Sequence, residues 1–93
     1  MFKVNEYFDG KVKSISFDTE EGPATAGVMA AGEYEFGTSS KEIMTITTGR
    51  MDVILPGENE WKTIKQNESF SVEADLKFRV KISSDCSYIC LYK

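Results

Sequence analysis

The side chains best suited to chemistry are carboxylates and phenols, because this chain of 93 residues contains no histidine. Glu35 and Glu42 stand on either side of a short polar segment, and Tyr88, Cys90 and Tyr92 alternate along one segment near the end of the chain. If that last segment is a strand, its alternate residues share one face. A carboxylate can stabilise a developing positive charge, while phenols can flank a planar ligand and donate hydrogen bonds.

The composition contains few residues that could bind a metal ion. Glu35 and Glu42 could hold a hard cation such as Mg²⁺ or Ca²⁺ through oxygen alone. A zinc site on Cys86 and Cys90 would need two further ligands, and the imidazoles that usually supply them are missing. Along one strand these cysteines would be ~13 Å apart, whereas a disulfide needs a Cα separation of roughly 4.4 to 6.8 Å. We therefore expect two buried free thiols and no metal ligands among the site residues.

Charge and hydropathy exclude several classes of partner. The net charge is −4 and the lysines and arginines are spread singly, whereas nucleic-acid binding needs a basic stripe. An anionic membrane surface is disfavoured for the same reason. No apolar run approaches the ~20 residues that span a bilayer, and residues 1–6 lack the apolar region of a secretory signal. We therefore expect a cytoplasmic protein.

Short extended segments separated by turn residues dominate the chain. Alternation of polar and apolar residues predicts about nine strands, and no segment has a helical stripe. In the first of these strands the pattern directs Val12, Ile15 and Phe17 toward the core, with a bulge near Ser14. Evenly spaced strands with intervening turns are typical of an all-β sandwich or barrel, here a single domain over residues 1–93. The expected strands are 11–17, 25–31, 33–37, 42–48, 51–55, 61–65, 69–72, 76–82 and 87–92.

One spacing narrows this class to a cupin, a jelly-roll barrel also called a double-stranded β-helix. Cupins carry His-x-His, three or four residues, Glu, six residues and Gly. Here Glu42 and Gly49 keep the second half of that frame, while the two histidine positions hold Glu35 and Gly37. The position of the third histidine holds Phe78. The frame therefore predicts a cupin-like barrel that lacks the usual metal ligands.

The chain also resembles, over roughly residues 5–92, a family of small bacterial cupins, the pyrimidine/purine nucleoside phosphorylases. The most specific part of the resemblance is the opening stretch from Asn5 to Ile15. The chain departs from the family at Glu73 and Ala74, where Pro-Gly is common, and at Asn67 or Glu68, one of which replaces an expected Gly. The other matches are Gly27-Val28-Met29, Gly32-Glu33-Tyr34, Glu42, Met44-Thr45, Gly49, Leu55-Pro56, Trp61, Tyr88, Cys90 and Tyr92.

This resemblance implies phosphorolysis by a homodimer. Purine and pyrimidine nucleosides would react with inorganic phosphate, as co-substrate and without another cofactor, to give a free base and ribose 1-phosphate. In the cupin register Glu42 would lie near the ribose as the catalytic carboxylate, and Tyr88 and Tyr92 would flank the base. Glu35 and Thr48 would also face inward. The loop containing Thr38 and Ser39 would bind phosphate through backbone N–H groups.

Two other functions fit the same residues. A cupin without histidines could bind a small molecule and catalyse nothing. Alternatively, a cation held by carboxylates alone could serve a sugar isomerase. Dependence of base release on phosphate, and its response to a chelator, would separate the three.

Overall fold

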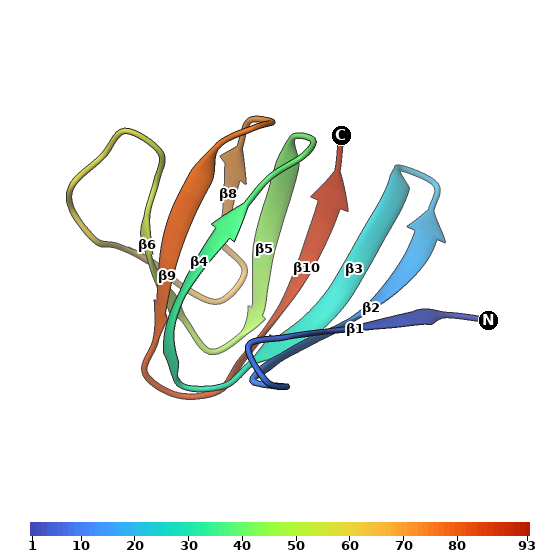
Figure 1. Cartoon of the computed structure of the whole chain (residues 1–93), viewed down its shortest axis with the longest axis horizontal. Helices are drawn as coiled ribbons and strands as arrows, with labels where there is room; N and C mark the ends of the chain where they lie inside the picture. Colours follow the sequence, from blue (N-terminus) through green and yellow to red (C-terminus); the bar gives the residue numbers. More distant parts are fainter.

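The computed structural model describes all 93 residues as ten antiparallel strands in two sheets that face each other (Figure 1). The chain contains no helix that could span a membrane. The strands and their arrangement in two sheets confirm the predicted all-β barrel. The strands are β1 (Lys3–Tyr7), β2 (Val12–Thr19), β3 (Gly22–Met29), β4 (Gly32–Gly37), β5 (Glu42–Thr48), β6 (Met51–Ile54), β7 (Lys62–Ile64), β8 (Ser69–Val72), β9 (Lys77–Ile82) and β10 (Cys86–Tyr92).

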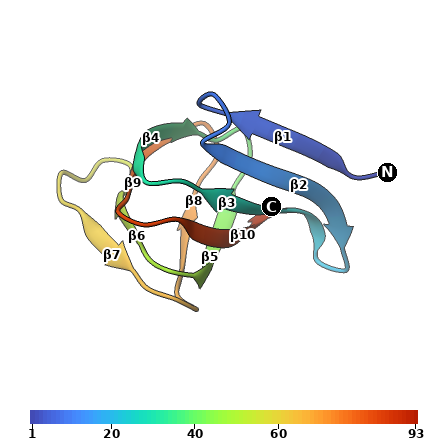
Figure 2. The same ribbon diagram turned by 90° about the horizontal axis from the view of Figure 1, so that it is seen from below.

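The two sheets differ in size and join segments that are distant in sequence. The larger has the order β1-β2-β3-β10-β5-β8, and the smaller has the order β4-β9-β6-β7. The last strand, β10, lies between β3 and β5, so the end of the chain pairs with two strands from much earlier in the sequence. Seen from below, β1 and β2 lie at one end of the molecule and β7 lies at the other (Figure 2).

The strand missing from the sequence prediction is β1. It pairs with β2 over five residues, from Lys3 with Ser16 to Tyr7 with Val12. All five of its residues are exposed or half-buried, so a hydrophobic pattern could not reveal it. The turn that follows places Phe8 and Asp9 at φ of 55° and 57°, the left-handed conformation of a type I′ hairpin. Neither residue is the glycine that normally marks such a turn.

The core fills the space between the two sheets and consists of 15 buried residues. It includes Val12, Ile46, Val53 and Val80, all 0% exposed. The phase expected for β2 was wrong beyond Val12: Ser14 is buried, whereas Ile15 lies on the outer face. The strand runs in regular register without a bulge, so a serine occupies the inward position.

Candidate active site

A cavity of about 140 Å³ lies between the sheets and opens to solvent. Its polar groups are one carboxyl group, three phenols and one serine hydroxyl, and it contains no lysine or arginine. Aromatic rings close much of its wall, since Phe36 stacks on Phe78 with ring centroids 5.6 Å apart. The cavity is therefore lined mostly by apolar and aromatic residues, with the polar groups of Ser14, Glu42 and the tyrosines among them. Its lining residues are Tyr7, Ser14, Met29, Phe36, Gly37, Glu42, Met44, Phe78, Tyr88 and Tyr92.

Glu42 supplies the only carboxyl group of this cavity. It begins β5 and is half-buried, with Val72 and Tyr92 as its neighbours on the two adjoining strands. The thiol of Cys90 donates to its Oε1 over 3.4 Å. Burial raises the pKa of Glu42, and the bond from Cys90 opposes that rise. Because burial and the nearby carboxylate raise the pKa of Cys90 to about 12, the thiol keeps its proton at neutral pH and remains a donor.

Tyr88 lies on the same face of β10 as Cys90 and Tyr92, as its alternation predicted. Its ring lies against Gly27 of β3, the residue that pairs with it in the sheet. A Cβ atom at Gly27 would lie 2.5 Å from both Cζ and Oη of Tyr88, so only glycine leaves room for the ring. Burial raises the pKa of Tyr88 to about 12. Its phenol is therefore protonated throughout the physiological range.

Tyr92 stands between the cavity and a second, outer compartment of about 440 Å³. Its hydroxyl is 3.0 Å from the hydroxyl of Thr25, which holds the ring in place. Tyr7 borders both spaces as well. The outer compartment also contains Lys3 and Ser40, so it brings a cation and a loop hydroxyl close to the cavity mouth.

The inward direction predicted for Glu35 and Thr48 is wrong. Glu35 is exposed, and its neighbours Tyr34 and Phe36 turn inward instead. The bulky aromatic residues of β4 decide which face is buried, and that choice sends Glu35 to solvent. Thr48 is exposed at the far end of β5, and the register between β5 and β10 shifts at Tyr88. Neither side chain lines the cavity.

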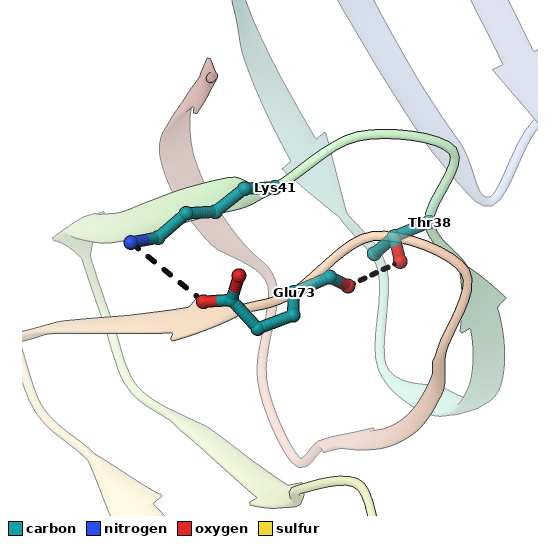
Figure 3. Close-up of polar contacts among 3 residues, drawn as sticks. All are labelled: Thr38, Lys41 and Glu73. Carbon is teal, nitrogen blue, oxygen red and sulfur yellow. Dashed lines mark hydrogen bonds and ion pairs between the residues drawn. The ribbon is translucent and has the colours of Figure 1, made fainter.

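The loop predicted to bind phosphate contains one buried anchor and two accessible serines. The Thr38 hydroxyl donates to the carbonyl oxygen of Glu73 over 2.7 Å, and the Thr38 hydroxyl oxygen accepts from the Leu76 amide over 3.1 Å. Figure 3 shows this bond beside the ion pair of Lys41 and Glu73, whose atoms are 3.7 Å apart. The Thr38 hydroxyl is thus committed to holding two loops together. Ser39 is exposed and remains accessible to a ligand.

Replacing Thr38 with valine should destabilise the fold, because a buried hydroxyl with several partners would be lost. Leaving the carbonyl of Glu73 and the amide of Leu76 without a partner costs about 1–3 kcal/mol of unfolding free energy. Urea unfolding of T38V and of S39A, in which an exposed hydroxyl is removed, measures the difference. Equal midpoints for the two variants would contradict this anchoring role.

The residues present do not fit a cupin metal centre. Of the four frame positions, Glu35 points outward, Gly37 has no donor and Phe78 contributes a ring to the cavity wall. Glu42 alone retains a ligand atom there. The structure has no group of three or more His, Cys, Asp or Glu side chains that could hold a metal ion. Glu35 and Glu42 therefore do not face the same cavity and cannot hold a cation together there.

Sequence reasoning missed Tyr7, Ser14 and Phe36 as lining residues of the cavity. Tyr7 was hidden because β1 was not expected, and Phe36 because the phase of β4 was reversed. Ser14 was assigned to a bulge, although a serine at an inward position between apolar residues can itself indicate a polar contact in the core. Tyr88 and Tyr92 could be grouped correctly because simple alternation holds throughout β10.

Comparison with known sequences shows the family to which this chain belongs. A sequence model of the family described as pyrimidine/purine nucleoside phosphorylase matches residues 2–92. This chain belongs to that family. A protein of that name from Alcanivorax borkumensis is 60% identical over 92 residues, which cover 99% of this chain and 98% of that protein. A second, from Pseudomonas putida, is 56% identical over 93 residues, covering 100% of this chain and 99% of the other.

Solved structures agree with the fold. A protein of unknown function from Vibrio parahaemolyticus superposes with a TM-score of 0.93 at 39% identity, over 97% of this chain and 96% of that one. An RmlC-like cupin from Shewanella frigidimarina superposes with a TM-score of 0.72 at 15% identity, over 96% of this chain and 80% of the other. The second likeness concerns the fold alone, and it confirms the cupin architecture that the spacing around Glu42 predicted.

Proposed function

We propose that this phosphorylase family member cleaves both purine and pyrimidine nucleosides with inorganic phosphate, as a pentosyltransferase that needs no metal. Membership of the family supports phosphorolysis. The observation that carries the mechanism is the single half-buried carboxyl group, that of Glu42, in an aromatic cavity without basic side chains. A site of this kind favours a reacting centre that becomes positively charged.

The reaction breaks one bond at the anomeric carbon of the ribose and forms another. The bond between C1′ and the base nitrogen breaks, and its electron pair leaves with the base. A phosphate oxygen donates a pair to C1′ from the opposite side, which gives ribose 1-phosphate. Between these events C1′ carries positive charge, so the transition state resembles an oxocarbenium ion. The base takes up a proton from water where its final form requires one.

Glu42 stabilises this transition state electrostatically in the proposed mechanism. Its ionised carboxylate faces the cavity, where the low polarity of Phe36, Phe78 and Met44 strengthens attraction to a cationic sugar. Tyr88 and Tyr92 border the base, as their common strand face suggests. Because the carboxylate is anionic when it acts, phosphate must approach from another direction to avoid repulsion.

We place phosphate in the outer compartment, next to the Thr38–Lys41 loop. Backbone N–H groups at Ser39 and Ser40 donate to no backbone carbonyl, so they are available to an anion. Lys3 lines the same compartment and supplies positive charge. Thr38 contributes to this site by fixing the loop through its bonds to Glu73 and Leu76, and its hydroxyl is not itself a ligand.

A base-release assay tests this function against its alternatives. Uridine and inosine are incubated with the purified protein, with and without phosphate, and the free base and ribose 1-phosphate are quantified. Release that depends on phosphate and persists in EDTA supports the phosphorylase. Release that EDTA abolishes would favour a metalloenzyme, and nucleoside binding without turnover would favour a binding protein.

We propose further that two copies pair through the outer face of the large sheet. Val4, Ile15 and Val28 are 63%, 45% and 53% exposed on this face and line a shallow groove with Ile89. No acidic side chain lines the groove, so two copies of an acidic chain can approach there with little repulsion. Burying this surface would also supplement the thin core expected of so short a chain.

Replacing Val28 with glutamate should convert the dimer into a monomer. The substitution would place two like charges in an apolar interface, where unpaired charge is strongly unfavourable. Light scattering coupled to gel filtration should find twice the 10.4 kDa chain mass for the wild type and once that mass for V28E. The control is L76E, which alters another exposed apolar residue outside the groove and should remain dimeric. A dimeric V28E would place the interface elsewhere.

We also assign the protein to the cytoplasm. Cys86 and Cys90 are buried free thiols, as the strand spacing predicted, and unpaired cysteines suit a reducing compartment.

A further inference from the structure

A polar chain of Asn5, Ser14 and Tyr88 crosses the inner face of the large sheet. The side-chain amide of Asn5 donates to Ser14 Oγ over 3.2 Å and to Ser16 Oγ over 3.0 Å. Both amide hydrogens are therefore used. Ser14 is only 4% exposed and faces the cavity from the same face of β2 as Val12. These contacts explain why a serine occupies a core position.

Tyr88 reaches this chain across an intervening strand. Gly27 of β3 pairs with Ser14 on one side and with Tyr88 on the other. Because the tyrosine ring lies within 2.5 Å of where a Gly27 Cβ would be, the phenol extends over β3 toward Ser14. A side-chain hydrogen bond from Ser14 also opposes the rise in the pKa of Tyr88. Both residues line the same cavity.

The hydrogen bonds that link Asn5, Ser14 and Tyr88 run in one direction. Ser14 Oγ accepts a hydrogen from Asn5, so its own hydroxyl hydrogen can be donated to the Tyr88 oxygen, in line with the effect of Ser14 on the pKa of Tyr88. The hydrogen of Tyr88 is then directed away from Ser14, toward the interior of the cavity. The side-chain nitrogen of Asn5 can only donate. Through Ser14 it therefore orients the phenol of Tyr88 as a hydrogen-bond donor.

We propose that Asn5 and Ser14 are positioning residues that hold Tyr88 as a hydrogen-bond donor to the departing base. This inference rests on the proposed phosphorolysis. When the bond from C1′ to the base nitrogen breaks, the electron pair spreads over the ring nitrogens and carbonyl oxygens of the base. A single O–H donor stabilises that charge in a purine or a pyrimidine, because it does not read a base-specific edge. Tyr88 transfers no proton; water supplies any that the released base takes up.

Steady-state kinetics with three variants tests the direction of these hydrogen bonds. Y88F removes the donor and should lower kcat by about 100-fold, the effect of losing one donor to developing charge. S14A leaves the phenol unoriented and should lower kcat by about tenfold, as a misplaced group does. N5D is nearly isosteric but only accepts, so Ser14 and then Tyr88 turn toward it. It should therefore lower kcat as much as Y88F does.

Double variants separate this role from a merely structural one. In the Y88F background, S14A and N5D should not reduce kcat further, since they act through the phenol. S16A removes the other acceptor of Asn5 and is the matched control for the spectroscopic test below. The control for turnover is S71A, which removes an exposed serine hydroxyl outside both compartments and should keep kcat within about twofold of wild type. All losses should shrink with 4-nitrophenyl riboside, whose leaving group needs little stabilisation. Fully additive losses, or an unchanged Y88F, would overturn the proposal.

A spectroscopic measurement tests whether Asn5 and Ser14 orient Tyr88, and it does not rely on turnover. In protein labelled with ¹³C at tyrosine Cζ, the Tyr88 signal should shift in S14A and N5D and stay in place in S16A. An unmoved Tyr88 signal in all three variants would overturn the inference. Should the wild type release no base from any nucleoside, the proposed function fails, while this signal still decides whether Asn5 and Ser14 orient the phenol.

Discussion

Replacing Glu42 with glutamine should lower kcat for nucleoside phosphorolysis by about 100- to 1,000-fold, the range found for losing one preorganised electrostatic group. The amide keeps the shape of the carboxyl group but cannot balance the positive charge at C1′. Initial rates of base release from uridine and inosine at saturating phosphate measure the effect. E42D, which retains the charge on a shorter side chain, should recover part of the activity. A fully active E42Q would remove Glu42 from the mechanism.

The pH dependence provides an independent check on the same residue. Burial raises the pKa of Glu42 above 4.5. As the pH is lowered, the carboxylate should therefore be protonated, and the wild-type rate should begin to fall, before the pH reaches 4.5. A raised pKa also means that the folded state binds the proton more tightly than the unfolded state. The stability from that bound proton is lost as the pH rises through the folded-state pKa. E42Q should therefore be at least as stable as wild type at pH 7, and a less stable variant would contradict this view.

Replacing Gly27 with alanine should both destabilise the protein and reduce its activity. The new Cβ would lie 2.5 Å from Cζ and Oη of Tyr88, closer than any real contact, and would force the ring out of place. Overpacking of a core costs about 1–3 kcal/mol of unfolding free energy. A displaced phenol no longer meets the base, which should lower kcat by about 100-fold. Urea unfolding and base-release kinetics measure the two effects.

A second glycine provides the control for stability. At Gly37 an added Cβ would have the carbonyl oxygen of Leu76 as its nearest contact, 3.9 Å away, so G37A should unfold at nearly the wild-type midpoint. The Y88A substitution combined with G27A removes the ring that causes the clash. It should therefore abolish the extra destabilisation due to G27A. If G27A and G37A unfold at the same urea concentration, the close approach of Tyr88 to β3 is not a packing constraint.

Local pattern was sufficient for most of the strands and for one face of the site. Alternation in Cys86–Tyr92 correctly predicted that Tyr88 and Tyr92 share a face, and alternation in Lys77–Ile82 places Phe78 and Val80 inward and Arg79 outward. The frame of Glu42 and Gly49 correctly indicated a cupin. In Lys77–Ile82 bulky apolar side chains alternate with charged ones, so only one phase buries apolar surface.

Pattern failed where the decisive contact comes from another strand. Trp61 lies half-buried on the outer face of the small sheet, where Lys81 Nζ is 4.7 Å from its ring centre. The inward position of Ser14 depends on Asn5 of β1, and Gly27 is required only because Tyr88 lies over it. A single-strand periodicity contains no information about a hydrogen-bond partner on a neighbouring strand.

The sequence by itself determined the all-β class, the cupin frame, the absence of imidazole ligands and the choice of Glu42 as the central carboxyl group. These follow from composition and from spacing along one strand. The tertiary structure alone decided that Glu35 and Thr48 leave the cavity, that Thr38 anchors a loop, and that Tyr7 and Ser14 enter the site. The physical reason is that a cavity between two sheets is lined by strands distant in sequence, and its lining depends on which faces those sheets turn toward each other.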